Sequence, residues 1–339
     1  MKKFLVITVS FILAFCLLLS GTGCSRTVLL SFSNNFNDGK DPNNLKETLT
    51  YSVEYTDNYG DGLIKKDSEL TDDVFKFEFK NGKYVQTLET LSFLPDSIET
   101  DIDVENTKIL KLTGKLTIDF IYTVDGEEKT NNDYVEQEVY FLLAGMSFAP
   151  IYSSVKSDFT LVGLSESEVS VTKDEYVTTT EYNKETYTVT RTLGEEETVN
   201  DYEYEFRTAV DNNQLLFILR SLKLQEDATR NVPFVSPVYG EAKELMIKNQ
   251  ADLSTVVNVS YNGGEKQEET LASKNLSYFV NETRQAGSAQ FVVIQDAKSD
   301  NFGNRALPLV YAETLTTYGA FTSMGALVYT ISEVSVVNE

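Results

Sequence analysis

The strongest constraint on the fold is an alternation of apolar and polar residues with a period of two. It is plainest over 110–124, where Leu110, Leu112, Leu116 and Ile118 alternate with polar or small residues. Successive side chains of a β-strand point to opposite faces, so this pattern predicts a strand with one buried face. Similar runs rich in Thr, Val, Tyr and Phe predict further strands at 48–55, 74–79, 135–142, 169–178, 186–192, 202–207, 244–248, 255–261, 290–295, 306–315 and 327–337.

Turn sequences separate many of these runs. Asn81-Gly82, Asp125-Gly126, Gly194-Glu195 and Asn262-Gly263-Gly264 are typical of tight turns, because Gly and Asn enter the positive-φ region at low cost. The first two are expected to form hairpins. Since a hairpin joins antiparallel neighbours, the sequence predicts a mainly β protein with an antiparallel meander.

One segment, 211–222, breaks the period of two. Asp211 is suited to cap a helix, because its carboxylate accepts a hydrogen bond from a free backbone N–H of the first turn. The residues that would then lie on one stripe are Leu215, Ile218, Leu219 and Leu222. The sequence therefore predicts a single amphipathic helix packed on the sheet.

Residues 1–23 have the layout of a secretory signal peptide. Two lysines precede an apolar stretch from Phe4 to Leu19, and small residues follow up to Gly23. The apolar stretch is shorter than the roughly 20 residues that a membrane-spanning helix needs. We therefore expect export and removal of this segment.

Cys24 follows the small residues directly. The segment 18–24 resembles the lipobox of bacterial lipoproteins, although Gly21 stands where the strongest form of that motif has Leu. The resemblance implies that acyl chains are attached at Cys24 and hold the protein extracytoplasmically, at the outer face of the cell membrane or at an outer membrane. The alternative is an ordinary signal peptide cleaved near Gly23, with Cys24 as a free thiol.

The segment 24–44 is rich in Ser, Asn and Asp, which is typical of a flexible tether. Residues 45–339 are then expected to form the antiparallel β domain, as one body or as two lobes. The other cysteine, Cys16, belongs to the predicted signal peptide, so no disulfide is expected. The domain must be stabilised by its hydrophobic core.

Histidine is absent from the chain, and this excludes whole classes of chemistry. A Ser-His-Asp triad, a Cys-His pair and a histidine-ligated zinc are all impossible. A carboxylate-based hydrolase is the exception that composition leaves open, but the chain lacks Trp, a common platform for sugars. We therefore predict no enzyme activity, no catalytic residue and no cofactor.

The formal net charge of −23 bears on partners. So negative a surface repels nucleic acid, and nucleic acid is not expected to bind. Three acidic loops, 37–41, 57–62 and 296–301, offer oxygen ligands for calcium. None of them has the twelve-residue spacing of an EF-hand, so no metal site is predicted.

The predicted helix, with its sequence Leu-Arg-Ser-Leu at 219–222, resembles the helix of DUF3108-like proteins, a bacterial envelope family of unknown function. Residues 304–308 resemble a terminal strand of that group. These proteins are related in shape to the lipoprotein carriers LolA and LolB. The resemblance implies a curved antiparallel sheet, an open or half β-barrel, wrapped round the helix and enclosing an apolar cavity.

Together these features lead to two hypotheses. The first is a non-enzymatic, membrane-anchored lipoprotein that binds or carries an apolar ligand, such as a lipid, or scaffolds an envelope assembly. The second is a β-sandwich adhesin or structural module that recognises a protein or glycan through its loops. The first predicts a curved sheet, and the second predicts two flat packed sheets.

Overall fold

The structure is a computed structural model that describes residues 35–37, 40, 42–105, 107–144, 147–164, 169–205, 207–222, 224–236, 242–280, 290–295, 298–317 and 322–338. The predicted signal peptide, 1–23, and Cys24 lie outside these residues. None of the helices in the described ranges is long and apolar enough to cross a bilayer.

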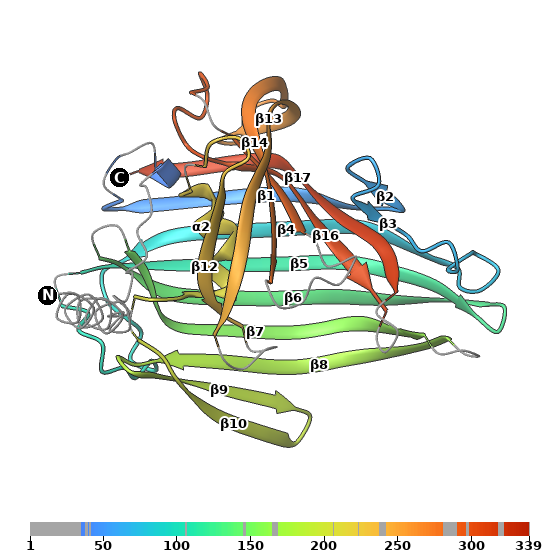
Figure 1. The fold of residues 1–339 in the computed structure, drawn as a ribbon, viewed down its shortest axis with the longest axis horizontal. Coiled ribbons are helices and arrows are strands. Elements are labelled where there is room, and N and C mark those ends of the chain that lie inside the picture. Colours follow the sequence, from blue (N-terminus) through green and yellow to red (C-terminus); the bar gives the residue numbers. More distant parts are fainter. Residues whose placement is uncertain are drawn as a thin grey trace, which may run out of the picture.

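Most of the described chain belongs to one large curved sheet, as predicted (Figure 1). Fifteen strands follow the order β10-β9-β8-β7-β6-β5-β4-β1-β17-β16-β15-β14-β13-β12-β11, and a separate pair is formed by β2 and β3. The strands are β1 (Leu45–Thr56), β2 (Asn58–Tyr59), β3 (Ile64–Lys65), β4 (Phe77–Leu91), β5 (Lys108–Val124), β6 (Glu127–Ala144), β7 (Ser147–Leu164), β8 (Val169–Tyr182), β9 (Thr186–Leu193), β10 (Glu196–Glu203), β11 (Val210–Asp211), β12 (Thr229–Val235), β13 (Lys243–Tyr261), β14 (Gln267–Val280), β15 (Gln290–Gln295), β16 (Pro308–Thr316) and β17 (Ser323–Asn338).

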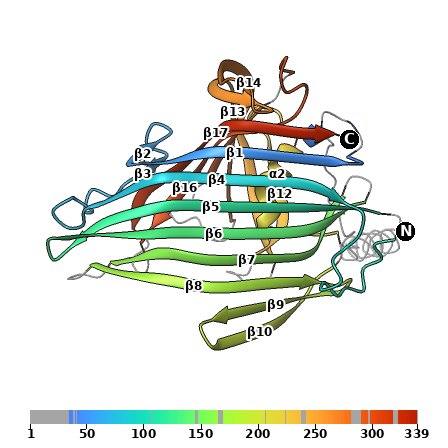
Figure 2. The ribbon, with the colours of Figure 1, turned by 180° about the vertical axis from the view of Figure 1, so that it is seen from behind.

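The strands β4 to β10 form a meander of long antiparallel neighbours, which Figure 2 shows from behind. The hairpin predicted at Asp125-Gly126 joins β5 to β6, and both residues have positive φ. The hairpin predicted at Asn81-Gly82 is wrong. These residues form a β-bulge inside the continuous strand β4, where the register shifts between Lys80 and Lys83. Glycine is required there because a Cβ would collide with the carbonyl oxygen of Val53 on the adjacent strand.

Other strand boundaries also differ from the predictions. The two strands predicted at 244–248 and 255–261 are one strand, β13, with an irregularity between Asn249 and Ala251. The strand predicted at 202–207 ends with β10 at Glu203. The sequence missed β7 because its first five residues are all buried, which hides the alternation.

The second half of the sheet folds back across the first. Figure 1 shows β12, β13 and β14 running steeply across the direction of the strands β4 to β7, with α2 beside β12. The end of β13 meets β17 in a short parallel pairing, Ser260 with Glu333 and Tyr261 with Val334. One core cluster joins both halves through this crossing, since it contains Leu112 of β5 and Ile247 of β13. A single hydrogen-bonded sheet replaces the two flat sheets that the adhesin hypothesis predicts.

The predicted helix is present but shorter and more deeply buried than predicted. It begins with a 3₁₀ turn, η2 (Asn212–Gln214), and continues as α2 (Leu215–Arg220). Asp211 is the N-cap, as predicted. Its side chain accepts a hydrogen bond from the Asn213 backbone N–H, and Gln214 closes a capping box. Such a cap stabilises a helix by about 1 kcal/mol.

The helix is not amphipathic in the predicted sense. The predicted stripe is buried, but Phe217 and Arg220 on other faces are buried as well. The Phe217 ring packs against Phe148 of β7 and Phe141 of β6, with ring centroids 5.1 and 5.2 Å apart. The helix is enclosed between the two halves of the sheet, so it needs apolar residues on several faces.

The predicted tether, 24–44, must be shortened. Residues 35–37 form a 3₁₀ turn, η1, and Phe36 is fully buried against Phe148 and Phe217. An aromatic ring excluded from water stabilises the fold by a few kcal/mol, on the order of 3. The folded domain therefore includes residues 35–37. Of the rest of the predicted tether, the structure describes 40 and 42–44, whereas 24–34, 38, 39 and 41 lie outside the described residues.

Candidate functional site

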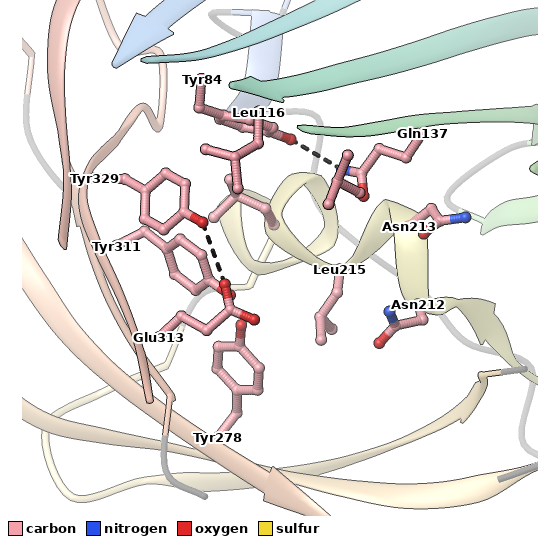
Figure 3. A pocket seen from close by; sticks show the side chains of 12 residues that line it. Tyr84, Leu116, Gln137, Asn212, Asn213, Leu215, Tyr278, Tyr311, Glu313 and Tyr329 are labelled. Atoms are coloured by element: carbon pink, nitrogen blue, oxygen red, sulfur yellow. Dashed lines mark hydrogen bonds between the residues drawn. The ribbon is translucent and has the colours of Figure 1, made fainter. Parts of the chain in front are cut away.

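A cavity of about 220 Å³ lies where the helical segment meets both halves of the sheet (Figure 3). Eight elements contribute to its wall, which combines apolar side chains with a group of tyrosines, three amides and one carboxylate. The lining residues are Tyr84, Leu116, Val135, Gln137, Asn212, Asn213, Leu215, Leu216, Tyr278, Tyr311, Glu313 and Tyr329. We call this cavity the tyrosine pocket.

Strand register explains how one wall of the tyrosine pocket forms. Tyr311 and Glu313 are two residues apart on β16, so their side chains lie on the same face of the strand. Tyr329 on β17 is the direct antiparallel partner of Tyr311, and their ring centroids are 4.9 Å apart. Tyr278 on β14 completes this wall, and Figure 3 shows the tyrosine side chains gathered around Glu313.

The opposite wall comes from the first half of the sheet and from the helix. The hydroxyl of Tyr84 accepts a hydrogen bond from Gln137 Nε2 at 2.9 Å, and its ring meets Tyr329 edge-on at 5.7 Å. Asn212 and Leu216 line the pocket from the helical segment. Asn212 is exposed to solvent, so the pocket opens beside the start of the helix.

Glu313 is the only acid among the described residues that line the pocket. Its Oε2 accepts a hydrogen bond from the Tyr329 hydroxyl at 3.3 Å. No lysine or arginine is among the described residues that line the pocket. Burial raises the pKa of Glu313, because the charged form loses hydration, and the Tyr329 hydrogen bond offsets only part of that rise.

The phenols of the pocket stay protonated over the physiological range. Burial raises the pKa of Tyr84 to about 12, with hydrogen bonds from Gln86 and Gln137 acting in the opposite direction. Burial, together with the negative charge of Glu313, raises the pKa of Tyr329 well above its usual value. The pocket thus offers neutral hydroxyls, neutral amides and a single group, Glu313, whose charge can change.

The described lining of the pocket lacks the pair of acids that a carboxylate-based hydrolase uses. Hydrolysis by paired carboxylates needs two acids on either side of the scissile bond, and Glu313 has no second acid among the described lining residues. Across the ranges that the structure describes, no three Asp, Glu or Cys side chains lie close enough to hold a metal ion. That finding includes the loop 57–62, whereas the loops 37–41 and 296–301 are described only in part.

Another acid, Glu47 of β1, is buried outside the tyrosine pocket and has a different environment. Arg220 of the helix binds it with two hydrogen bonds, Nη1 to Oε1 at 2.5 Å and Nη2 to Oε2 at 3.0 Å. Arg220 also donates to the carbonyl oxygens of Phe36 and Ala306. This cluster, which we call the arginine clamp, joins the helix to β1, to η1 and to the segment just before β16.

The sequence did not indicate a functional role for any of the pocket residues. Cys24, the one site residue that it predicts, lies outside the described residues. The signal that was available is a lone acid, Glu313, in phase with Tyr311 within a predicted strand. Taken alone, that spacing is equally typical of a strand face that is exposed to solvent.

Comparison with known proteins assigns no family. No protein-family model and no curated protein matches this chain. Among solved structures, a β-barrel-like protein of a domain of unknown function, DUF1849, from Brucella abortus aligns with 87% of this chain and 98% of its own at 8% identity and a TM-score of 0.44. A lysenin pore aligns over the same shares at 9% identity and a TM-score of 0.08. These scores are too low for either likeness to bear on function.

Proposed function

We propose that this protein is an exported lipoprotein, held at the outer face of a membrane by acyl chains on Cys24, that binds a small ligand in the tyrosine pocket without converting it. The observation that carries the proposal is the pocket itself, which is open beside Asn212 and walled by aromatic and amide side chains. Concave sites with apolar walls and a few convergent polar groups are the usual form of ligand sites.

The size of the pocket limits the ligand. Its volume of about 220 Å³ lies below the roughly 300–1,000 Å³ typical of drug-sized ligands. The rest of the space between the two halves of the sheet is filled by α2 and its aromatic neighbours. A compact molecule therefore suits this cavity better than a complete lipid acyl chain, and we narrow the apolar-ligand hypothesis accordingly.

Native mass spectrometry of the full-length protein, purified in a non-ionic detergent from cells that lipidate it, tests the binding function. We expect a small compound to be retained by the wild type and to be lost in Asn212→Trp, whose indole would close the entrance. Asn200→Trp is the matched control, because Asn200 is equally exposed but lies on β10 at the far edge of the sheet. An equal amount of bound compound in all three proteins would contradict a ligand site in this pocket.

The anchor is tested separately by the mass of the N-terminal peptide. We expect a mature chain that begins at Cys24 and carries acyl groups, and a Cys24→Ser protein without them. Two or more chains, at about 0.8 kcal/mol for each buried methylene, give stable attachment to a bilayer. A wild-type N-terminus free of acyl groups would contradict this part of the proposal.

A further inference from the structure

We propose that the tyrosine pocket selects a small organic cation, a substituted ammonium compound, with Glu313 as its counter-charge. This inference rests on the proposed binding function and adds the chemical class of the ligand. Its three supports are the unmatched carboxylate, the arrangement of the aromatic rings and the charge of the whole protein.

The unmatched carboxylate is the first support. An ionised carboxylate removed from water is costly unless a cation or several hydrogen bonds compensate it. Glu313 accepts one side-chain hydrogen bond, from Tyr329, and no lysine or arginine is among the described residues that line its pocket. Glu313 is partly buried, whereas Glu47 is almost fully buried and has a bidentate arginine. A ligand cation in the pocket would give Glu313 the compensating positive charge that Arg220 gives to Glu47.

The arrangement of the rings is the second support. Tyr84, Tyr278, Tyr311 and Tyr329 surround the space next to Glu313 (Figure 3). A cation near the face of an aromatic ring is attracted by the ring quadrupole, by about 2 kcal/mol where water is excluded. Substituted ammonium groups suit such a setting because their alkyl groups contact the rings while the charge contacts the acid. A dry cavity of about 150 Å³ accepts benzene, so the larger pocket here has room for a compact ammonium compound.

The charge of the protein is the third support. A formal net charge of −23 raises the local concentration of cations near the surface and lowers that of anions. A fatty acid or another anionic amphiphile would be repelled both by the negative charge of the whole protein and by the Glu313 carboxylate. A neutral ligand would leave Glu313 without compensation when it is ionised.

The test uses two probes of almost the same shape. Choline carries a quaternary nitrogen, and 3,3-dimethylbutan-1-ol carries a carbon atom in its place. Their affinities for the full-length protein in non-ionic detergent are measured by isothermal titration calorimetry near neutral pH. We expect choline to bind at least about tenfold more tightly than the alcohol, a difference of about 1.4 kcal/mol.

Two variants assign that preference to the pocket. Glu313→Gln keeps the shape and removes the charge. We expect the ratio of its affinities for choline and for the alcohol to fall to nearly one. Glu197→Gln removes the same charge from the exposed edge strand β10 and should keep the wild-type preference. If both variants lose the preference equally, or if neither does, Glu313 is not the recognising group and the inference is wrong.

The result for the wild type separates this inference from the proposed function. Equal binding of choline and the alcohol would overturn cation selectivity and leave a working ligand pocket. Absence of choline binding up to about 10 mM would also overturn the inference. The proposed function would then still depend on the compound retained in the Asn212→Trp comparison, which requires no assumption about charge.

Discussion

The arginine clamp and the tyrosine pocket each enclose one glutamate, and the two acids are treated in opposite ways. Glu47 is matched by the guanidinium of Arg220, which directs its remaining donors to Phe36 and Ala306. Glu313 has one phenol hydrogen bond and faces a cavity. A buried charge that the chain compensates contributes to holding the fold together. A partly buried charge that it leaves uncompensated, as at Glu313, lowers stability and is available to a ligand.

The largest effect is expected at the arginine clamp. Arg220→Met leaves Glu47 buried without a cation and the carbonyl oxygens of Phe36 and Ala306 without their donor. Breaking one partner of a buried ion pair costs about 3–5 kcal/mol. Urea denaturation of the variant should show a loss of that size.

The double variant Arg220→Met with Glu47→Leu is the control for this comparison. It removes both charges, so we expect it to recover most of the loss. If the double variant is as unstable as Arg220→Met alone, the stabilising role belongs to the arginine contacts with the backbone and not to the ion pair.

In the tyrosine pocket, removing the charge is expected to raise the free energy of unfolding instead of lowering it. Because burial raises the pKa of Glu313 above 4.5, the folded protein loses stability as pH rises through the range between 4.5 and that raised pKa. Glu313→Gln does not titrate, so it should be more stable than the wild type at neutral pH. A gain of about 1 kcal/mol is expected, in the range of the cost of an unsatisfied buried group.

Thermal unfolding at several pH values checks this prediction. The advantage of Glu313→Gln should shrink as pH falls and disappear well below 4.5, where Glu313 is protonated in both the folded and unfolded chains. A variant that is less stable than the wild type at neutral pH would mean that Glu313 is compensated within the fold and that the contrast with Glu47 does not exist.

The smallest effect is expected at an exposed ion pair, which sets the baseline for the comparison. Lys115 and Glu136 lie 2.5 Å apart on the surface of β5 and β6. Exposed pairs of this kind contribute about 0–1 kcal/mol. Glu136→Gln should therefore change the free energy of unfolding by less than about 1 kcal/mol, and a change as large as that of Arg220→Met would show that the method does not resolve buried from exposed charges.

The sequence predicted the local features of the fold, but it did not predict how the second half of the sheet folds back across the first. The alternation in β5, the hairpin at Asp125-Gly126 and the cap at Asp211 depend on residues close together in the chain, and the structure confirms them. The bulge at Asn81 depends on the approach of β1, which no local pattern records. The strand β7 was missed because its first five residues are all buried, which hides the alternation where the strand begins.

The tyrosine pocket could not be predicted for the same reason. Its lining extends from Tyr84 to Tyr329, and it exists only because the second half of the sheet crosses the helix. Arg220 illustrates the same limit. At helical spacing an arginine is normally placed on the wet face, and only the position of Glu47 explains why this one is buried.

The most direct test of the account is a measurement of the pKa of Glu313 by NMR of its carboxyl carbon, assigned with Glu313→Gln. In the free protein the titration midpoint should lie above 4.5. The phenols of Tyr84, Tyr278, Tyr311 and Tyr329, which face this carboxyl group, do not titrate in that range. With saturating choline the midpoint should move down, because a cation in the pocket stabilises the ionised form. An unchanged midpoint at saturation would contradict the claim that this acid is kept for a ligand.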